Sequence, residues 1–130
     1  MIRVSSEPRF LVVPPLCTRS SLPGDDRLQT LHRSLEFQHL APTAPDTLGC
    51  YPFAEKSEDP FVVRQCPQIY FAGNQPRFET GIMEGPDGQR VRTILVPDFH
   101  EEHTCVLVNL NTLECRPMSF AGFPTAAMEA

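Results

Sequence analysis

The chain has 130 residues, and its 14 prolines exclude a helical bundle or a coiled coil because each proline removes a backbone donor and fixes φ. An apolar fraction of 41% suffices for one modest core, and no apolar run approaches the ~20 residues of a membrane span, so we expect at most one soluble domain. The net charge of −5 comes with a single lysine, Lys56, and without the clustered basic side chains that nucleic-acid binding requires.

Residues 1–24 show no consistent periodicity, and we predict an irregular segment there. Three arginines against one glutamate give this segment a charge of +2, whereas eight basic against fifteen acidic residues give the remainder −7. The apolar run Phe10–Val13 is interrupted by Pro14 and Pro15, well short of the ~7–15 residues of a secretory signal. A transit peptide is a weaker alternative, since the segment contains Arg and Ser and almost no acid.

Residues 25–41 contain no proline and predict one amphipathic helix over Asp25–Leu40. Leu28, Leu31 and Leu35 recur at helical spacing and mark the face that should be buried. Two aspartates open the helix, where negative charge suits the helix dipole, and Pro42 is expected to end it.

Residues 41–60 contain four prolines and a glycine, which excludes regular structure. Leu48, Cys50, Tyr51 and Phe53 are nevertheless too apolar for a solvated linker. We therefore predict a long ordered loop packed on the domain surface, of the kind that often forms the rim of a binding site.

From residue 61 onward the pattern is that of β-structure, and short turns predict an antiparallel meander of four or five strands. Residues 84–88 predict one turn and residues 109–112 a tight hairpin connection. Thr104–Leu110 is apolar on both faces, so we expect a central strand in a sheet that is covered on both sides. The predicted strands are Phe61–Val63, Gln68–Ala72, Arg77–Met83, Arg90–Val96, Thr104–Leu110 and Leu113–Ser119.

Two histidines and three acids lie within Asp98–His103, and a metal site using Asp98, His100 and His103 is one interpretation. Helical metal sites place their ligands at i and i+3 or i+4. Here Pro97 precedes the cluster and a strand follows it, so the two imidazoles need not converge. A solvated acidic turn is the favoured interpretation.

The segment Gly73–Pro76 follows an apolar strand, at the position where open sheets place catalytic groups. Asn74 could ligate a metal through its amide oxygen, but Gln75 is a poor ligand and Pro76 is none. Because Gly and Asn both tolerate positive φ, an ordinary turn is favoured.

Nucleophilic chemistry finds no support in the sequence, since no nucleophile elbow, P-loop or dinucleotide-binding glycine pattern is present. His32 is expected to be a partly exposed side chain on the helix. Five cysteines without a CxxC pair or a secretory signal indicate reduced thiols in an intracellular protein, each expected to be a small buried residue. These are Cys17, Cys50, Cys66, Cys105 and Cys115. The residues alone indicate a β-rich domain that is either non-enzymatic or part of an enzyme.

Five blocks of the chain resemble the C-terminal part of the small (B, regulatory) subunits of DNA polymerase delta, within the wider B-subunit family of DNA polymerases alpha, epsilon and delta. The blocks stand in family order across residues 25–123 and are long enough to be specific. They comprise residues 39–53, 66–78, 96–99, 107–110 and 118–123.

That family joins an oligonucleotide-binding fold to a calcineurin-like phosphoesterase domain that has lost its metals in eukaryotic members. The resemblance implies an α/β fold, α+β in this chain: the C-terminal portion of a phosphoesterase β-sandwich, with one helix and a mainly antiparallel β-meander. Active relatives carry Gly-His-x-His at a strand end, and these histidine positions correspond to Asn74 and Pro76. Since Pro76 has no lone pair to donate, the resemblance implies no catalytic residue, no metal and no cofactor.

The resemblance also implies a nuclear accessory subunit for DNA replication that meets DNA only through its complex. The expected partners are the cysteine-rich C-terminal domain of the polymerase delta catalytic subunit and a third accessory subunit. Tyr51, Pro52 and Phe53 are candidate interface or structural residues, because aromatic side chains in a rigid loop are good anchors.

The implied organisation has three parts: a divergent or irregular segment (1–24), the phosphoesterase-like part (25–123) and a disordered tail (124–130). Two alternatives stay open. One is a metal-dependent phosphodiesterase that uses the 98–103 cluster or a remodelled Asn74 site. The other is a truncated chain without function, which would leave one face of a half sandwich uncovered.

Overall fold

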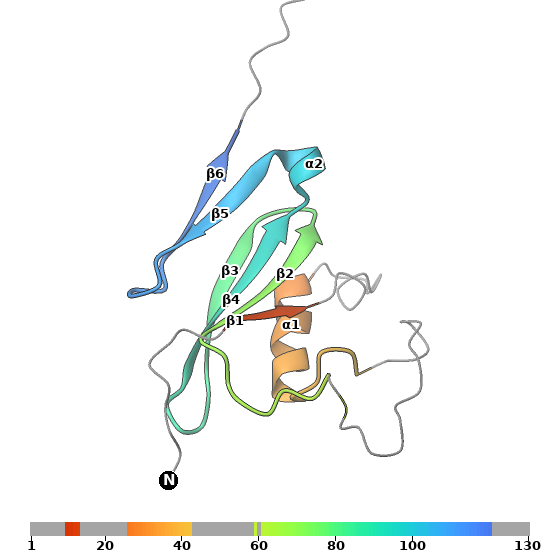
Figure 1. The fold of residues 1–130 in the computed structure, drawn as a ribbon, viewed down its shortest axis with the longest axis vertical. Helices are drawn as coiled ribbons and strands as arrows, with labels where there is room; N and C mark the ends of the chain where they lie inside the picture. Colours follow the sequence, from red (N-terminus) through yellow and green to blue (C-terminus); the bar gives the residue numbers. More distant parts are fainter. Residues whose placement is uncertain (1–9, 14–25, 43–58, 60, 121–130) are drawn as a thin grey trace, which may run out of the picture.

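The computed structural model describes residues 10–13, 26–42, 59 and 61–120. Figure 1 shows a four-stranded sheet with one helix against it and a separate two-stranded ribbon beyond the sheet. The elements in chain order are β1 (Phe10–Val13), α1 (Arg27–Glu36), β2 (Ile69–Gln75), β3 (Glu79–Glu84), β4 (Arg90–Pro97), α2 (Phe99–Glu102), β5 (Thr104–Val108) and β6 (Cys115–Ser119). Neither described helix is long and apolar enough to cross a membrane.

The sheet has the strand order β1-β2-β4-β3, and the ribbon pairs β5 with β6. The predicted mixed α+β fold with one main helix is confirmed. The expected antiparallel neighbours are found in β3–β4 and in β5–β6. β2, however, pairs in parallel with both β1 and β4. β2 lies inside the sheet between β1 and β4, and most of its side chains are buried or half-buried.

The helix forms where the leucine spacing predicts it, and Leu31 and Leu35 are buried against the sheet. Asp26 caps the helix by accepting a hydrogen bond from Gln29 N at 3.0 Å. The predicted end at Pro42 is wrong: α1 ends at Glu36, because Gln38 takes a left-handed conformation with φ of 53° that stops the helix.

The core lies between α1 and the face of the sheet that α1 covers. Tyr70 is fully buried there and its hydroxyl lies 2.8 Å from Ser34 Oγ of the helix. The core cluster consists of Leu31, Leu35, Val63, Tyr70, Ala72, Val91 and Leu95. β2 and β4 are therefore the central strands of this fold.

Two strand predictions are corrected. Phe61–Val63 is not a strand, since Val62 forms only an isolated bridge with His39. Thr104–Leu110 is not a central strand, because it shortens to β5 of a two-stranded ribbon in which Leu107 is 53% exposed. Apolar residues on both faces of this strand therefore do not mean that other elements pack on both faces.

The structure also contains two elements that the sequence pattern did not predict. β1 takes the apolar run Phe10–Val13 into the sheet, in parallel register with β2. α2 is a single helical turn within the 98–103 cluster. The rest of the 1–24 segment, most of the 41–60 loop with Tyr51, Pro52 and Phe53, and the 124–130 tail lie outside the described residues.

Candidate functional site

The carboxyl ends of β2 and β4 bring together the two segments singled out by sequence. Asp98 N donates a hydrogen bond to Gln75 O at 2.9 Å, which joins the ends of the neighbouring parallel strands. Asn74 and Pro76 lie here and both are exposed. The Asn74 segment and the 98–103 cluster thus share the edge of the sheet at which open sheets commonly bind ligands.

The turn predicted at Gly73–Pro76 is corrected, because β2 continues to Gln75. The strand pairing is irregular between Ala72 and Gln75, and Asn74 has a φ of 54° within this irregularity. Asn tolerates this conformation better than most residues, so the property that suggested a turn allows a bulge instead. Gln75 is buried, and its Nε2 donates to Gly73 O at 2.8 Å.

The Asp98–His103 cluster is organised by its own backbone. Asp98 Oδ1 accepts a hydrogen bond from His100 N at 2.9 Å and so caps α2. His103 ends the turn in a left-handed conformation, with its ring 6.1 Å from the ring of Phe99. His100, Glu101 and His103 are exposed, in agreement with the solvated acidic turn that the sequence favours.

Metal ligation requires at least three suitable side chains that converge on one point. Among the described residues, no three His, Cys, Asp or Glu side chains do so.

A second organised feature holds the two ends of the 41–60 loop together. His39 Nε2 lies 2.9 Å from Asp59 Oδ2, and Ala41 N donates to His39 Nδ1 at 3.1 Å. Nδ1 therefore acts as the acceptor and Nε2 as the donor to the carboxylate. Phe61 N also donates to Asp59, at 2.8 Å, and these two hydrogen bonds hold the pKa of Asp59 below its ordinary value.

Backbone hydrogen bonds reinforce this junction. Leu40 N donates to Phe61 O at 2.9 Å, and Val63 N donates to Gln38 O at 2.7 Å. We call residues 38–41, 59 and 61–63 the loop clasp. It was not predicted from the sequence, because its partners are 20 residues apart and follow no periodicity. The one available signal is the occurrence of His39 and Asp59 at the two boundaries of the proline-rich segment.

The histidine and cysteine predictions have mixed outcomes. His32 is half-buried, as expected, and its Nε2 lies 2.8 Å from the hydroxyl of buried Thr93. Cys66, Cys105 and Cys115 are free thiols. The expectation that each cysteine is buried is wrong for these three, since Cys66 is exposed and the other two are half-buried in the β5–β6 ribbon. Cys17 and Cys50 lie outside the described residues.

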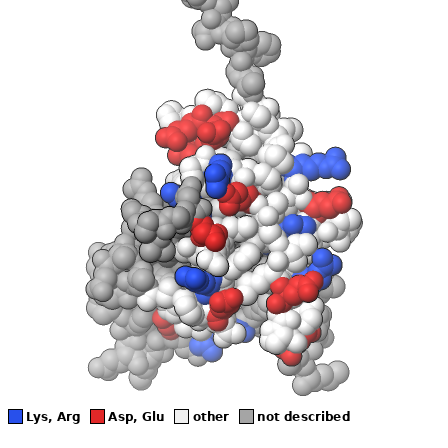
Figure 2. All heavy atoms as spheres, turned by 180° about the vertical axis from the view of Figure 1, so that it is seen from behind, with Lys and Arg blue, Asp and Glu red and all other residues white. Residues whose placement is uncertain are grey.

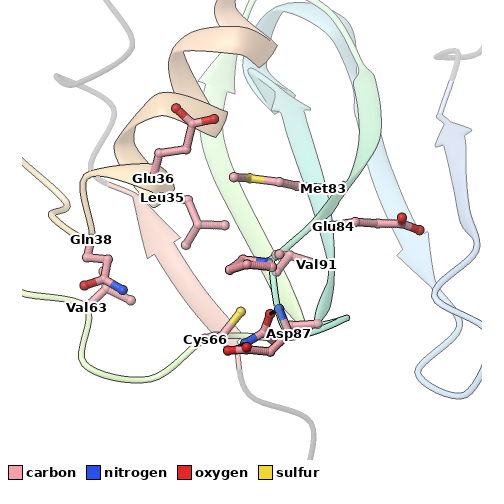
Figure 3. Close-up of a pocket in the computed structure, with 12 residues that line it drawn as sticks. Leu35, Glu36, Gln38, Val63, Cys66, Met83, Glu84, Asp87 and Val91 are labelled. Atoms are coloured by element: carbon pink, nitrogen blue, oxygen red, sulfur yellow. Dashed lines mark hydrogen bonds between the residues drawn. The ribbon is translucent and has the colours of Figure 1, made fainter.

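A pocket of about 510 Å³ opens at the opposite end of the sheet, between the end of α1 and the β3–β4 turn. Figure 3 shows Leu35 and Met83 approaching it from the helix and from β3, with Val91 and Cys66 below them. Glu36 and Asp87 also line it. The sequence predicts the turn but gives no sign that the turn and the helix end enclose a pocket.

Charged side chains are mixed over the face seen in Figure 2, where Lys or Arg groups and Asp or Glu groups alternate without a continuous basic stripe in the described part. Among the described residues, Arg90 Nε lies 3.6 Å from Glu84 Oε1. Exposed pairs of this kind contribute little to stability.

Comparisons with known proteins agree with the sequence resemblance. The family model for the B subunits of DNA polymerases alpha and epsilon matches residues 15–80. The chain is 47% identical over 96 residues to the DNA polymerase delta small subunit of Oryza sativa subsp. japonica, covering 74% of this chain and 22% of the relative. It is 45% identical over 97 residues to DNA polymerase delta subunit 2 of Drosophila melanogaster, covering 75% of this chain and 22% of the relative.

A third relative, the DNA polymerase delta small subunit of Saccharomyces cerevisiae, is 41% identical over 90 residues, covering 69% of this chain and 18% of the relative. The chain therefore spans about a fifth of the length of the curated relatives it matches.

Proposed function

Because this chain belongs to the B-subunit family of DNA polymerases alpha and epsilon, we propose that it serves as a non-catalytic accessory subunit, or part of one, in a DNA polymerase delta complex. The observation that carries this proposal is an identity of 41–47% to the DNA polymerase delta small subunits of a plant and a yeast, over 69–74% of the chain. The matched region must include β2 and β3, because any segment of 96 residues in a chain of 130 contains the middle of the chain, where these strands lie.

The absence of catalysis is supported by the chemistry of the sheet edge. By the family resemblance, the metal-binding histidines of active relatives correspond to Asn74 and Pro76. Both are exposed at the carboxyl end of β2, and a proline ring nitrogen within the peptide chain cannot ligate a metal. In the neighbouring cluster, the Asp98 side chain accepts a hydrogen bond from its own helical turn instead of contributing to a shared metal centre.

The role we infer is to hold other subunits together. The partners are the cysteine-rich C-terminal domain of the catalytic subunit and a third accessory subunit, with DNA reached only through the complex in the nucleus. Residues 25–123 would be the C-terminal part of an inactive phosphoesterase-like domain. The loop clasp supports an interface at Tyr51, Pro52 and Phe53, because anchored loop ends lower the entropy lost when the loop binds.

Binding of the isolated partners tests this proposal. The tagged full chain is mixed with the catalytic subunit's C-terminal domain, or with the third subunit, and the affinity is measured by calorimetry. We expect binding to at least one partner and weaker binding after the substitution Tyr51→Ala. Leu107→Ala, at an exposed apolar residue of the ribbon, serves as the control. Binding to neither partner would contradict the proposal.

A further inference from the structure

The pocket between α1 and the β3–β4 turn has an apolar floor. Leu35 and Val63 are 9% and 8% exposed, and Val91 is 2% exposed, so the floor belongs to the core. Met83 completes it as a half-buried wall on β3. A volume of about 510 Å³ is in the range that receives a small ligand or one long side chain.

The rim of this pocket is negative. Glu36, at the end of α1, and Asp87, on the turn, are exposed, and no described Lys or Arg forms an ion pair with either. Glu84 also lines the pocket but contributes less, since its carboxylate points away in Figure 3 and lies 3.6 Å from Arg90 Nε. The described lining contains no basic side chain.

The turn that carries Asp87 is held in one conformation. Gly85 N donates to Gln89 O at 2.8 Å, and Gln89 Nε2 donates to Asp87 Oδ2 at 3.1 Å. Asp87 N donates in return to Gln89 Oε1 at 3.2 Å. The Asp87 carboxylate is thus positioned before any partner arrives, which reduces the entropy that binding costs.

Cys66 adds a neutral group to the same pocket. Although Cys66 as a whole is exposed, desolvation of its sulfur raises the pKa of the thiol above the ordinary value, so the sulfur remains protonated at neutral pH. It therefore extends the apolar surface between the floor and Asp87, and it provides a chemical reporter of whether the pocket is filled.

An apolar floor with a carboxylate rim suits one class of side chain. Arginine and lysine have long aliphatic stems that pack on apolar surface while their charged ends stay at the edge. We propose that this pocket receives an arginine or lysine side chain from a protein partner, an inference that rests on the proposed function. The stem lies over Leu35, Met83 and Val91, and the charged end pairs with Asp87, while Glu36 at the opposite end of the pocket in Figure 3 adds negative charge to the rim.

Charge reversal at the rim tests this inference in the full chain. Glu36→Lys and Asp87→Lys replace exposed residues, so the fold should be retained; Glu101→Lys on α2 is the matched control. Affinity for the catalytic subunit's C-terminal domain and for the third subunit is measured for each variant. We expect each rim variant to bind one partner about 10-fold more weakly, and the control to change it by less than about twofold.

Alkylation of Cys66 by iodoacetamide, read by mass spectrometry of its peptide, gives a second measurement. We expect slower alkylation in the complex than in the free chain. The inference would be overturned if both rim variants bind with unchanged affinity and Cys66 is alkylated as fast in the complex as in the free chain. Binding by the wild-type chain would in that case still uphold the proposed function. If wild type binds neither partner, both fail.

One further outcome identifies a different occupant. If Cys66 is protected in the free chain and becomes reactive when residues 1–9 are removed, the pocket receives the chain's own Arg3 or Arg9. This result would also overturn the assignment to a partner.

Discussion

The hydrogen bond between Ser34 and Tyr70 offers a direct test of how α1 is attached to the sheet. Both residues are buried, with exposed fractions of 7% and 0%. Ser34 Oγ also lies 2.8 Å from Leu31 O, and either hydroxyl can be the donor in the 2.8 Å contact between Ser34 and Tyr70. Each of two substitutions removes one hydroxyl of this contact.

Tyr70→Phe removes one hydroxyl of the contact, so we expect a loss of about 1 kcal/mol in the free energy of unfolding. Ser34→Ala removes the other hydroxyl, so we expect a similar loss of about 1 kcal/mol. Because both single variants lose the same hydrogen bond, the loss in the double variant should be about 1 kcal/mol smaller than the sum of the single losses.

Urea denaturation followed by circular dichroism measures the four free energies of this cycle. Ser119→Ala, at an exposed position of β6, is the control and should change stability by less than about 0.5 kcal/mol. If the two losses add to within about 0.3 kcal/mol, the contact between α1 and β2 that we describe does not exist.

Local geometry and chemistry give three other predictions. Because folding lowers the pKa of Asp59, its ionised form stabilises the protein at pH values above the ordinary pKa of 3.8. Asp59→Asn should therefore lower the free energy of unfolding at neutral pH, and the difference from wild type should shrink as the pH falls below 3.8. A difference that does not change with pH would contradict this. Gly88 has a φ of 77°, so Gly88→Ala should cost about 1 kcal/mol in thermal melts, whereas Gly73→Ala, where a Cβ meets nothing, should cost less; equal costs would contradict this. With Mn²⁺ and a phosphodiester substrate we expect no turnover; turnover abolished by His100→Ala would refute the non-catalytic role.

The helix illustrates what the sequence could predict. The spacing of Leu28, Leu31 and Leu35 identifies the buried face, because that face is set by the helical repeat. The end of the helix depends on the conformation of one residue, Gln38, and no periodicity reports it. The face was therefore predictable and the boundary was not.

The strands show where apolar pattern stops being informative. The residues of β2 and of β5 are both apolar, yet Tyr70 is fully buried and Leu107 is largely exposed. The difference lies in what packs against each strand, which depends on residues distant in the chain. β1 was not predicted, because it becomes a strand by pairing with β2, which lies far along the sequence.

The candidate sites divide in the same way. The location of Asn74 and Asp98 at one sheet edge follows once β2 and β4 are parallel neighbours, but the sequence pattern favoured an antiparallel meander. The loop clasp and the pocket each join segments that are separate in sequence, through His39 and Asp59 in one case and Glu36 and Asp87 in the other. Such sites require the tertiary fold.

The linking role that we propose, between the other components of a DNA polymerase delta complex, is tested most directly by a recovery experiment. The tagged third subunit is purified from mixtures with the catalytic subunit's C-terminal domain, with and without the full chain, and the amount of catalytic domain recovered is measured. We expect recovery only when the chain is present. Equal recovery in its absence, or none in its presence, would contradict the linking role.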